Sequence, residues 1–310
     1  MRETFTTLQT QAHNYTQTAS TDTGVNTFLK SELNRAQRFV FAELEEYIGQ
    51  KNAQTTTADG QQYYDYPRDL SKLETVKITI GSVDYDLDVV NSADYWNEIN
   101  AVTFSGSAIP KFFFPRKDDF GIWPEPQDDY TMLITYSYQP KDMSASDYTT
   151  GTIALTNGDA TVTGSGTTFT SAMVGRWING DGHWYKIGSF TSTTSLELAQ
   201  EFDGTTASGL SYTIGESPDI PAEAHELLSF RAAARYFMGL KNNQAVGQFW
   251  ENMFFTGDGV NRSRDPADAA GGLLGLKKRY SRRSNSRVVR MRRRGDRDIL
   301  VDKHWATVIS

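Results

Sequence analysis

A stretch of 67 residues, Thr149–Gly215, most restricts what this chain can fold into. It holds 15 Thr, 11 Gly and no Pro, and it lacks the three- and four-residue apolar spacing of an amphipathic helix. Short β-prone runs alternate with Gly, Asn and Asp turns, which is typical of a small antiparallel sandwich or barrel. We therefore expect an inserted β-module over 149–215. The runs are Thr152–Thr156, Ala160–Thr163, Arg176–Ile178, Trp184–Phe190, Ser195–Ala199 and Ser211–Ile214.

Helical periodicity precedes this module. From Val25 to Ile48 apolar residues recur every three or four positions, with charged residues on the opposite face. Asp22 or Thr23 is the expected N-cap, and Gly49 is a natural stop. The polar residues before Asp22 offer few apolar anchors, so this helix is the first one predicted.

Helical periodicity also follows the module. Apolar residues from Leu227 to Met238 predict one long helix, and Gln244–Phe255 predicts another. The Gly-, Asp- and Ala-rich residues 256–275 read as a linker.

Between the first helix and the module, alternating residues predict β-hairpins. Asp59-Gly60 is a turn dipeptide that would join two short β-prone runs within 53–66. Gly81-Ser82 would join the strands 73–80 and 83–87. Further expected elements are a helical turn at 94–99, strands at 112–114, 121–123 and 131–138, and a turn at 124–129 between the last two strands.

These patterns predict an α+β fold: a small helical bundle with β-hairpins, plus an inserted antiparallel β-sandwich or barrel module. The expected divisions are 1–148 for the first part of the core, 149–215 for the inserted module, 216–256 for the second, helical part of the core, and 257–310 for a linker and a basic C-terminal arm.

The net charge of −7 hides a strong asymmetry. Between Lys277 and Arg297, which we call the basic arm, eleven basic residues and one acid give +10, and the remaining 20 basic and 37 acidic residues give −17. Such segregation indicates an interaction segment rather than an average surface. The basic residues are Lys277, Lys278, Arg279, Arg282, Arg283, Arg287, Arg290, Arg292, Arg293, Arg294 and Arg297.

The basic arm is open to three interpretations. It could dock on an acidic protein surface, contact nucleic-acid phosphates, or remain a solvated, disordered tail. Val288, Val289 and Met291 lie between the arginines, and apolar residues have little use in a pure polycation. This favours docking on a protein, and leaves the other two alternatives open.

The sequence contains few candidates for catalytic or metal-binding residues. The chain has no Cys, which excludes disulfides, thiolate metal sites and cysteine nucleophiles, and its four His are far apart. No nucleophile elbow or zinc-protease motif occurs, and Gly271–Lys277 has the wrong spacing for a phosphate loop. Asp118-Asp119 and Asp128-Asp129 could bind a cation, but solvated turn carboxylates are far commoner. We expect no enzyme activity, no cofactor and no metal.

Aromatic residues of the β-module allow one binding interpretation. Trp177, Trp184 and Tyr185 could form a platform on which a sugar stacks, whereas the simpler interpretation places them in the core. Asp181-Gly182-His183 could be a catalytic fragment, but a polar β-turn explains it better.

The sequence shows no leader or membrane-spanning pattern. The N-terminal residues have no apolar signal-peptide core, and no apolar run approaches the roughly 18–20 residues that span a bilayer. We expect a soluble protein made in a reducing cytoplasm, with no membrane partner.

Four motifs, in this order, resemble the head-to-tail adaptor (connector or neck) proteins of tailed bacteriophages. The segment 158–198, with Gly164–Phe169 and Met173–Arg176, separately looks like the immunoglobulin-like β-module of several phage structural proteins. The four motifs are Leu33–Arg38, Gly60–Leu73, Ile122–Pro126 with the strand that ends at Tyr136–Pro140, and Ile220–Leu228.

The resemblance implies a non-enzymatic virion protein of the neck, synthesised in the host cytoplasm. Such adaptors form a homo-oligomeric ring, commonly of twelve copies, which joins the portal protein to a tail or nozzle protein. The ring surrounds a channel through which genomic DNA passes during ejection without sequence-specific binding. The helices would build the ring wall, and the inserted module would project outward.

The same resemblance assigns the eleven basic residues to portal docking or nucleic-acid contact, since the C-terminal arm of such proteins reaches the portal. Two other functions stay open: a carbohydrate-binding or host-recognition protein that uses the β-module, and a DNA-binding protein that uses the basic arm.

Overall fold

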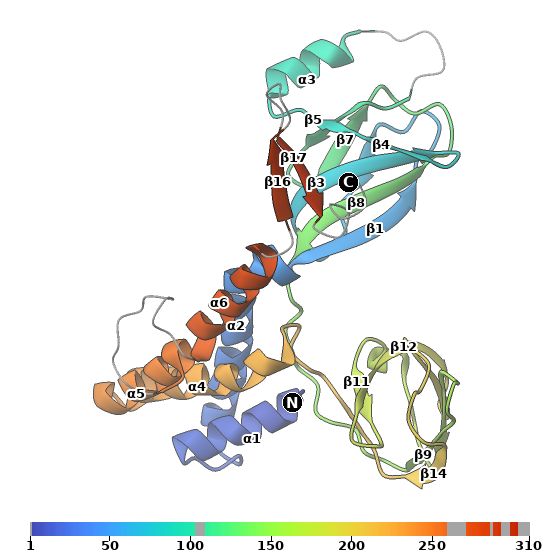
Figure 1. Ribbon diagram of the computed structural model, residues 1–310. Coiled ribbons are helices and arrows are strands. Elements are labelled where there is room, and N and C mark those ends of the chain that lie inside the picture. Colours follow the sequence, from blue (N-terminus) through green and yellow to red (C-terminus); the bar gives the residue numbers. More distant parts are fainter. Residues whose placement is uncertain (1, 103–108, 259–270, 286–287, 293–297, 303–310) are drawn as a thin grey trace. The chain divides into compact units, whose positions relative to one another are not determined.

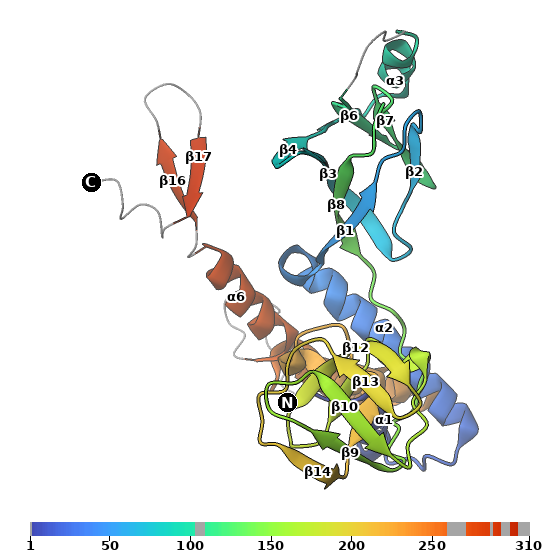
Figure 2. The same cartoon turned by 90° about the vertical axis from the view of Figure 1, so that its right-hand side faces the viewer.

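The chain divides into two units, drawn from two directions in Figures 1 and 2. One unit comprises Met1–Phe41 and Asp142–Ser310, and the other comprises Ala42–Lys141. The computed structural model describes residues 2–102, 109–258, 271–285, 288–292 and 298–302, with side chains as far as residue 281. Helices and separate β-sheets together confirm the predicted α+β class.

The first helix, α1 (Phe5–Thr16), is one that the sequence analysis did not predict. Thr4 is its N-cap, and the Thr4 hydroxyl accepts a hydrogen bond from the Thr7 N–H at 3.2 Å. Phe5, Leu8 and Ala12 are buried. The expectation that the helix after Asp22 is the first one is therefore wrong, because one apolar residue per turn is enough when the rest of the unit supplies a surface to pack against.

The second helix, α2 (Thr23–Ile48), confirms the prediction at both ends. Asp22 caps it, since its carboxylate accepts a hydrogen bond from the Val25 N–H at 3.1 Å. At the other end, a Cβ on Gly49 would lie 2.6 Å from the Glu45 carbonyl oxygen, so a larger residue would not fit. The buried stripe of α2 is Leu29, Leu33, Ala36, Val40 and Leu44.

Both helices predicted after the β-module are confirmed. α4 (His225–Arg235) continues into a π-helical turn (Tyr236–Leu240), and α5 (Gln244–Thr256) follows. The Asn243 side chain caps α5 by accepting a hydrogen bond from Val246 N–H. α4 packs against both α1 and α5, which makes a small bundle.

The C-terminal region contains structure that composition did not indicate. α6 (Gly272–Asn285) packs against α5, and it starts inside the segment read as a linker. Residues 259–270 of that segment lie outside the described residues. β16 (Val288–Arg292) and β17 (Asp298–Asp302) then pair as an antiparallel hairpin.

The second unit contains two four-stranded sheets. In one, the order is β1-β8-β3-β4, and β3 and β4 form the hairpin predicted across Gly81-Ser82, with Ile80 opposite Val83. In the other, the order is β2-β7-β6-β5, and β5 runs parallel to β6. The bounds are β1 (Gln50–Thr56), β2 (Tyr63–Asp65), β3 (Leu70–Ile80), β4 (Val83–Asp86), β5 (Asp88–Val89), β6 (Phe112–Pro115), β7 (Asp119–Trp123) and β8 (Thr131–Tyr138).

The hairpin predicted around Asp59-Gly60 is wrong. Gly60 does adopt a turn conformation, with φ of 71°, but β1 pairs with β8 and β2 pairs with β7. The Thr57 hydroxyl donates to the Asp128 carbonyl oxygen and accepts from the Tyr130 N–H. These bonds tie the β1–β2 connection to the β7–β8 connection, so both segments carry the chain from one sheet to the other instead of closing hairpins.

The helical turn predicted at 94–99 is α3 (Ala93–Asn100). Its Trp96 and Ile99 are buried together with Val90. The Trp96 ring stacks on Phe114 at a centroid distance of 5.2 Å, which seats α3 on the sheet that contains β6.

The β-module is a single sheet of seven strands, in the order β14-β9-β10-β13-β12-β11-β15. Figure 2 shows that the sheet is strongly curled. It closes around a core that includes Ile153, Phe169 and Ile214. Six strands correspond to predicted runs, and β14 is the one that was missed. The bounds are β9 (Thr152–Leu155), β10 (Thr161–Ser165), β11 (Trp177–Asn179), β12 (Trp184–Ser192), β13 (Ser195–Leu198), β14 (Ala207–Leu210) and β15 (Thr213–Gly215).

Candidate functional site

The basic arm starts on a helix that is anchored to the bundle. Leu273 and Leu276 of α6 are each only 1% exposed, and α6 packs against α5. The Arg279 guanidinium forms an ion pair with Glu223 at 2.9 Å, just before α4. The first part of the arm therefore has a fixed attachment rather than a loose one.

Two glycines allow this attachment. Gly257 and Gly272 have φ of 81° and 60°, a region that L side chains rarely adopt. A Cβ on Gly272 would lie 2.5 Å from the Phe255 carbonyl oxygen, and one on Gly257 would lie 2.8 Å from Gly272 N. The end of α5 and the start of α6 are thus in direct backbone contact.

Three of the eleven predicted basic residues have described side chains. Lys277 and Lys278 are half-buried on α6, and Arg279 is exposed. The side chains of the other eight lie outside the described part, and the assignment of all eleven to portal or nucleic-acid contact stays a prediction. These are Arg282, Arg283, Arg287, Arg290, Arg292, Arg293, Arg294 and Arg297.

Comparison with protein families decides which kind of protein this is. Residues 3–163, just over half of the chain, match the family described as SU10 adaptor protein. The chain belongs to the SU10 adaptor protein family. A search of curated proteins finds no match. The match runs from the segment before α1 into β10 and includes the first three motifs of the resemblance; Ile220–Leu228 lies beyond it.

Membership in the SU10 adaptor family makes the chain a phage structural adaptor and a component of the virion. The match ends early in the β-module, at residue 163, so the immunoglobulin-like identity of that module stays a prediction. Among the helices that the structure describes, none is both long and apolar enough to cross a bilayer.

The two Asp pairs that could bind a cation, Asp118-Asp119 and Asp128-Asp129, include residues with structural partners. Asp119 forms an ion pair with Arg116 at 3.3 Å, and the Asp128 side chain accepts the Asp129 N–H. Within the described residues, no group of three or more His, Asp or Glu could hold a metal ion.

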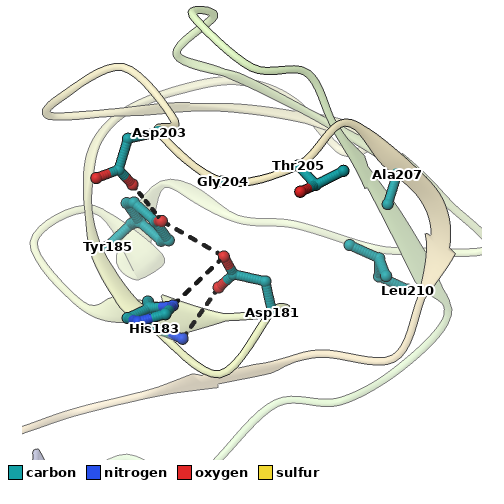
Figure 3. Close-up of a pocket in the computed structure, with 8 residues that line it drawn as sticks. All are labelled: Asp181, His183, Tyr185, Asp203, Gly204, Thr205, Ala207 and Leu210. Atoms are coloured by element: carbon teal, nitrogen blue, oxygen red, sulfur yellow. Dashed lines mark hydrogen bonds and ion pairs between the residues drawn. The ribbon is translucent and has the colours of Figure 1, made fainter.

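A polar turn confirms the simpler interpretation of Asp181-Gly182-His183 (Figure 3). The Asn179 side chain accepts the Gly182 N–H at 2.9 Å. The Asp181 carboxylate accepts the His183 N–H at 3.0 Å. His183 Nδ1 lies 3.6 Å from Asp181 Oδ2. This is a side-chain-stabilised turn at the β11–β12 connection.

Tyr185 is a packing residue with a fixed hydroxyl. Its ring lies 5.3 Å from that of Phe202, and its hydroxyl donates to Asp203 Oδ1 at 2.6 Å (Figure 3). Burial, followed by this hydrogen bond, raises the pKa of Tyr185. The hydrogen bond from Tyr185 lowers the pKa of Asp203. Tyr185 therefore fits the core interpretation better than the sugar-platform one.

The N-terminal segment binds the residues on both sides of the β-module, which we call its entry stem (Asp147) and its exit stem (Glu216). The Phe5 N–H donates to the Glu216 carbonyl oxygen at 2.7 Å, and the Thr4 hydroxyl donates to Asp147 Oδ2 at 2.8 Å. Asp147 N–H in turn donates to the Thr6 hydroxyl at 3.1 Å. Residues before and at the start of α1 thus bind both the entry and the exit of the module, a role that the polar N-terminal sequence did not reveal.

Proposed function

We propose that this SU10-family adaptor assembles into a ring that joins the portal protein to a tail or nozzle protein and surrounds the DNA channel in the phage neck. The observation that carries the proposal is the family match over residues 3–163, which covers α1, α2 and both sheets of the second unit. In this role the chain is non-enzymatic and takes part in virion assembly and genome ejection. Twelve copies is the number that the resemblance implies.

The basic arm is the proposed portal contact. The first turn of α6, just before the arm, is anchored through Leu273 and Leu276, so the nine arginines that follow start from a fixed base. Because the base of the arm is already ordered, docking loses less conformational entropy than it would with a fully flexible arm. Because charges across an interface are complementary, a charge of +10 in 21 residues favours an acidic partner surface.

The charge of the rest of the chain suits a DNA conduit. A body of −17 repels phosphates, so DNA can slide past it without sequence-specific binding. A basic lumen would instead hold the DNA. We therefore propose that the positive charge of the basic arm is directed to the portal protein and away from the channel.

Two variants, one that removes the charge of the basic arm and one that keeps it, test the role of the arm. In one variant, Gln replaces the six arginines beyond α6; in the matched control, Lys replaces them and keeps the charge. We expect the Lys variant to co-sediment with portal protein at about 150 mM salt, and the Gln variant to lose this binding while its thermal unfolding is unchanged. Portal binding by the Gln variant equal to that of the wild type would overturn the proposal. The six are Arg287, Arg290, Arg292, Arg293, Arg294 and Arg297.

The same variants separate portal docking from DNA binding. If the wild type binds duplex DNA with a steep salt dependence that the Gln variant lacks, while both bind portal equally, the arm contacts nucleic acid instead.

A further inference from the structure

Two tryptophans on the outer face of the β-module have different surroundings. The Arg2 guanidinium lies 3.4 Å from the centroid of the Trp177 ring, so the N-terminal segment covers Trp177. Trp184 is half-buried and lines an open cleft of about 360 Å³. Of the three aromatic residues considered as a sugar platform, Trp184 is therefore the one that lines this open space.

The floor of this cleft is a row of side chains across three strands. Asn179 of β11 is directly opposite Trp184 of β12 and Thr213 of β15. Residues directly opposite in neighbouring antiparallel strands project from the same face of the sheet. A hydroxyl, an amide and an indole thus lie side by side, and all three residues line the cleft.

The wall of the cleft comes from the start of α1 and the entry stem of the module. Thr4 donates to Asp147 Oδ2, and the Thr4 and Thr7 hydroxyl oxygens are 3.1 Å apart. With the Thr4 proton on Asp147, Thr7 is the donor to Thr4. Gly215 lets this wall approach the sheet, because a Cβ there would lie 2.6 Å from Asp147 Oδ1.

We propose that this cleft binds a neutral saccharide, so that the adaptor also recognises sugar. An indole offers a flat apolar surface for the C–H face of a pyranose ring, and the amide and hydroxyl groups exchange hydrogen bonds with sugar hydroxyls. Asp147 is the single charged residue among the described residues that line the cleft, which disfavours acidic sugars. The cleft volume lies within the range of about 300–1,000 Å³ that small-molecule sites occupy.

Saturation-transfer difference NMR on the full chain tests the proposal, with maltohexaose, cellohexaose and chitohexaose as separate probes. We expect at least one oligosaccharide to receive saturation at its ring C–H protons. Trp184→Ala should weaken its binding about ten-fold, which corresponds to about 1.4 kcal/mol. Trp177→Ala is the matched control, and it should bind within about two-fold of the wild type, because its ring faces Arg2 and not the cleft.

A second variant covers the case in which Trp184→Ala unfolds. Thr213→Val keeps the shape of the side chain and removes its hydroxyl, so it should weaken binding several-fold with an unchanged circular dichroism spectrum. The proposal is overturned if none of the three probes binds at millimolar concentration, or if folded Trp184→Ala and Thr213→Val bind as the wild type does. Equal loss in both Trp variants also overturns it, since the site would then not depend on the open cleft.

Discussion

His225 shows how one buried side chain ties distant parts of the sequence together. It is fully buried, and its Nδ1 accepts the Glu3 N–H at 3.0 Å. Since Nδ1 is an acceptor, Nε2 carries the proton and donates to the Ile220 carbonyl oxygen at 3.2 Å. The bond from Glu3 requires a neutral ring, because a protonated Nδ1 could not accept it. Burial lowers the pKa of His225 to about 4.

The depressed pKa of His225 predicts a stability that falls with acid. As the pH drops below about 6.5, the unfolded chain binds this proton while the folded chain does not, so the free energy of unfolding declines until about pH 4. The loss from this residue is about 3 kcal/mol. Urea unfolding at several pH values measures it. His225→Gln should show a slope between pH 6 and 4.5 that is smaller by about one proton; equal slopes would contradict the assignment.

Thr4 has two tasks, because it caps α1 and binds Asp147 in the stem of the β-module. Thr4→Val should lower the free energy of unfolding by about 1–2 kcal/mol. Thr10→Val is the control, since the Thr10 hydroxyl donates only to the Thr6 carbonyl oxygen on the exposed face of α1. Differential scanning calorimetry compares the two; equal melting temperatures would show that the stem bond contributes nothing.

At the scale of elements, the attachment of α6 depends on Gly272. Gly272→Ala places a Cβ against the Phe255 carbonyl oxygen and strains a positive φ, at a cost of about 1–3 kcal/mol. We expect α6 amides to lose protection in hydrogen exchange while α4 and α5 keep theirs. Gly239→Ala, where a Cβ would meet nothing within 4 Å, should leave the protection of α6 unchanged. Undiminished protection in Gly272→Ala would mean that α6 is not held at this contact.

The elements that the sequence predicts are those with strong local patterns. α2 has a cap, an apolar stripe and a stop within one segment, and the β3–β4 hairpin has a turn between alternating strands. α1 escaped prediction because its burial depends on packing against α4, which is more than 200 residues away. The β1–β8 and β2–β7 pairings join strands that are far apart in the sequence, and Thr57 bonds to residues 128 and 130 in the connections between them. No local pattern carries that information.

The candidate sites, too, are only partly predictable from local sequence patterns. Charge counting along the chain reveals the basic arm, yet it cannot show that Leu273 and Leu276 anchor its base. Composition names Trp177, Trp184 and Tyr185 together as candidates. Only the structure separates them: Arg2 covers Trp177, and Asp203 and Phe202 contact Tyr185. No local sequence pattern indicates these contacts.

At the scale of the whole molecule, the absence of cysteine leaves packing and charge to hold the protein to its partners. In the proposed function its −17 body and +10 arm have separate roles, the first toward passing DNA and the second toward the portal protein.

Negative-stain electron microscopy of the full chain, alone and mixed with the portal protein of the same phage, shows whether the proposed ring forms. We expect closed rings of this protein seated coaxially on the portal, with a central opening wide enough for duplex DNA. Portal particles without an added ring, at concentrations where both proteins are folded and in excess, would contradict the proposal.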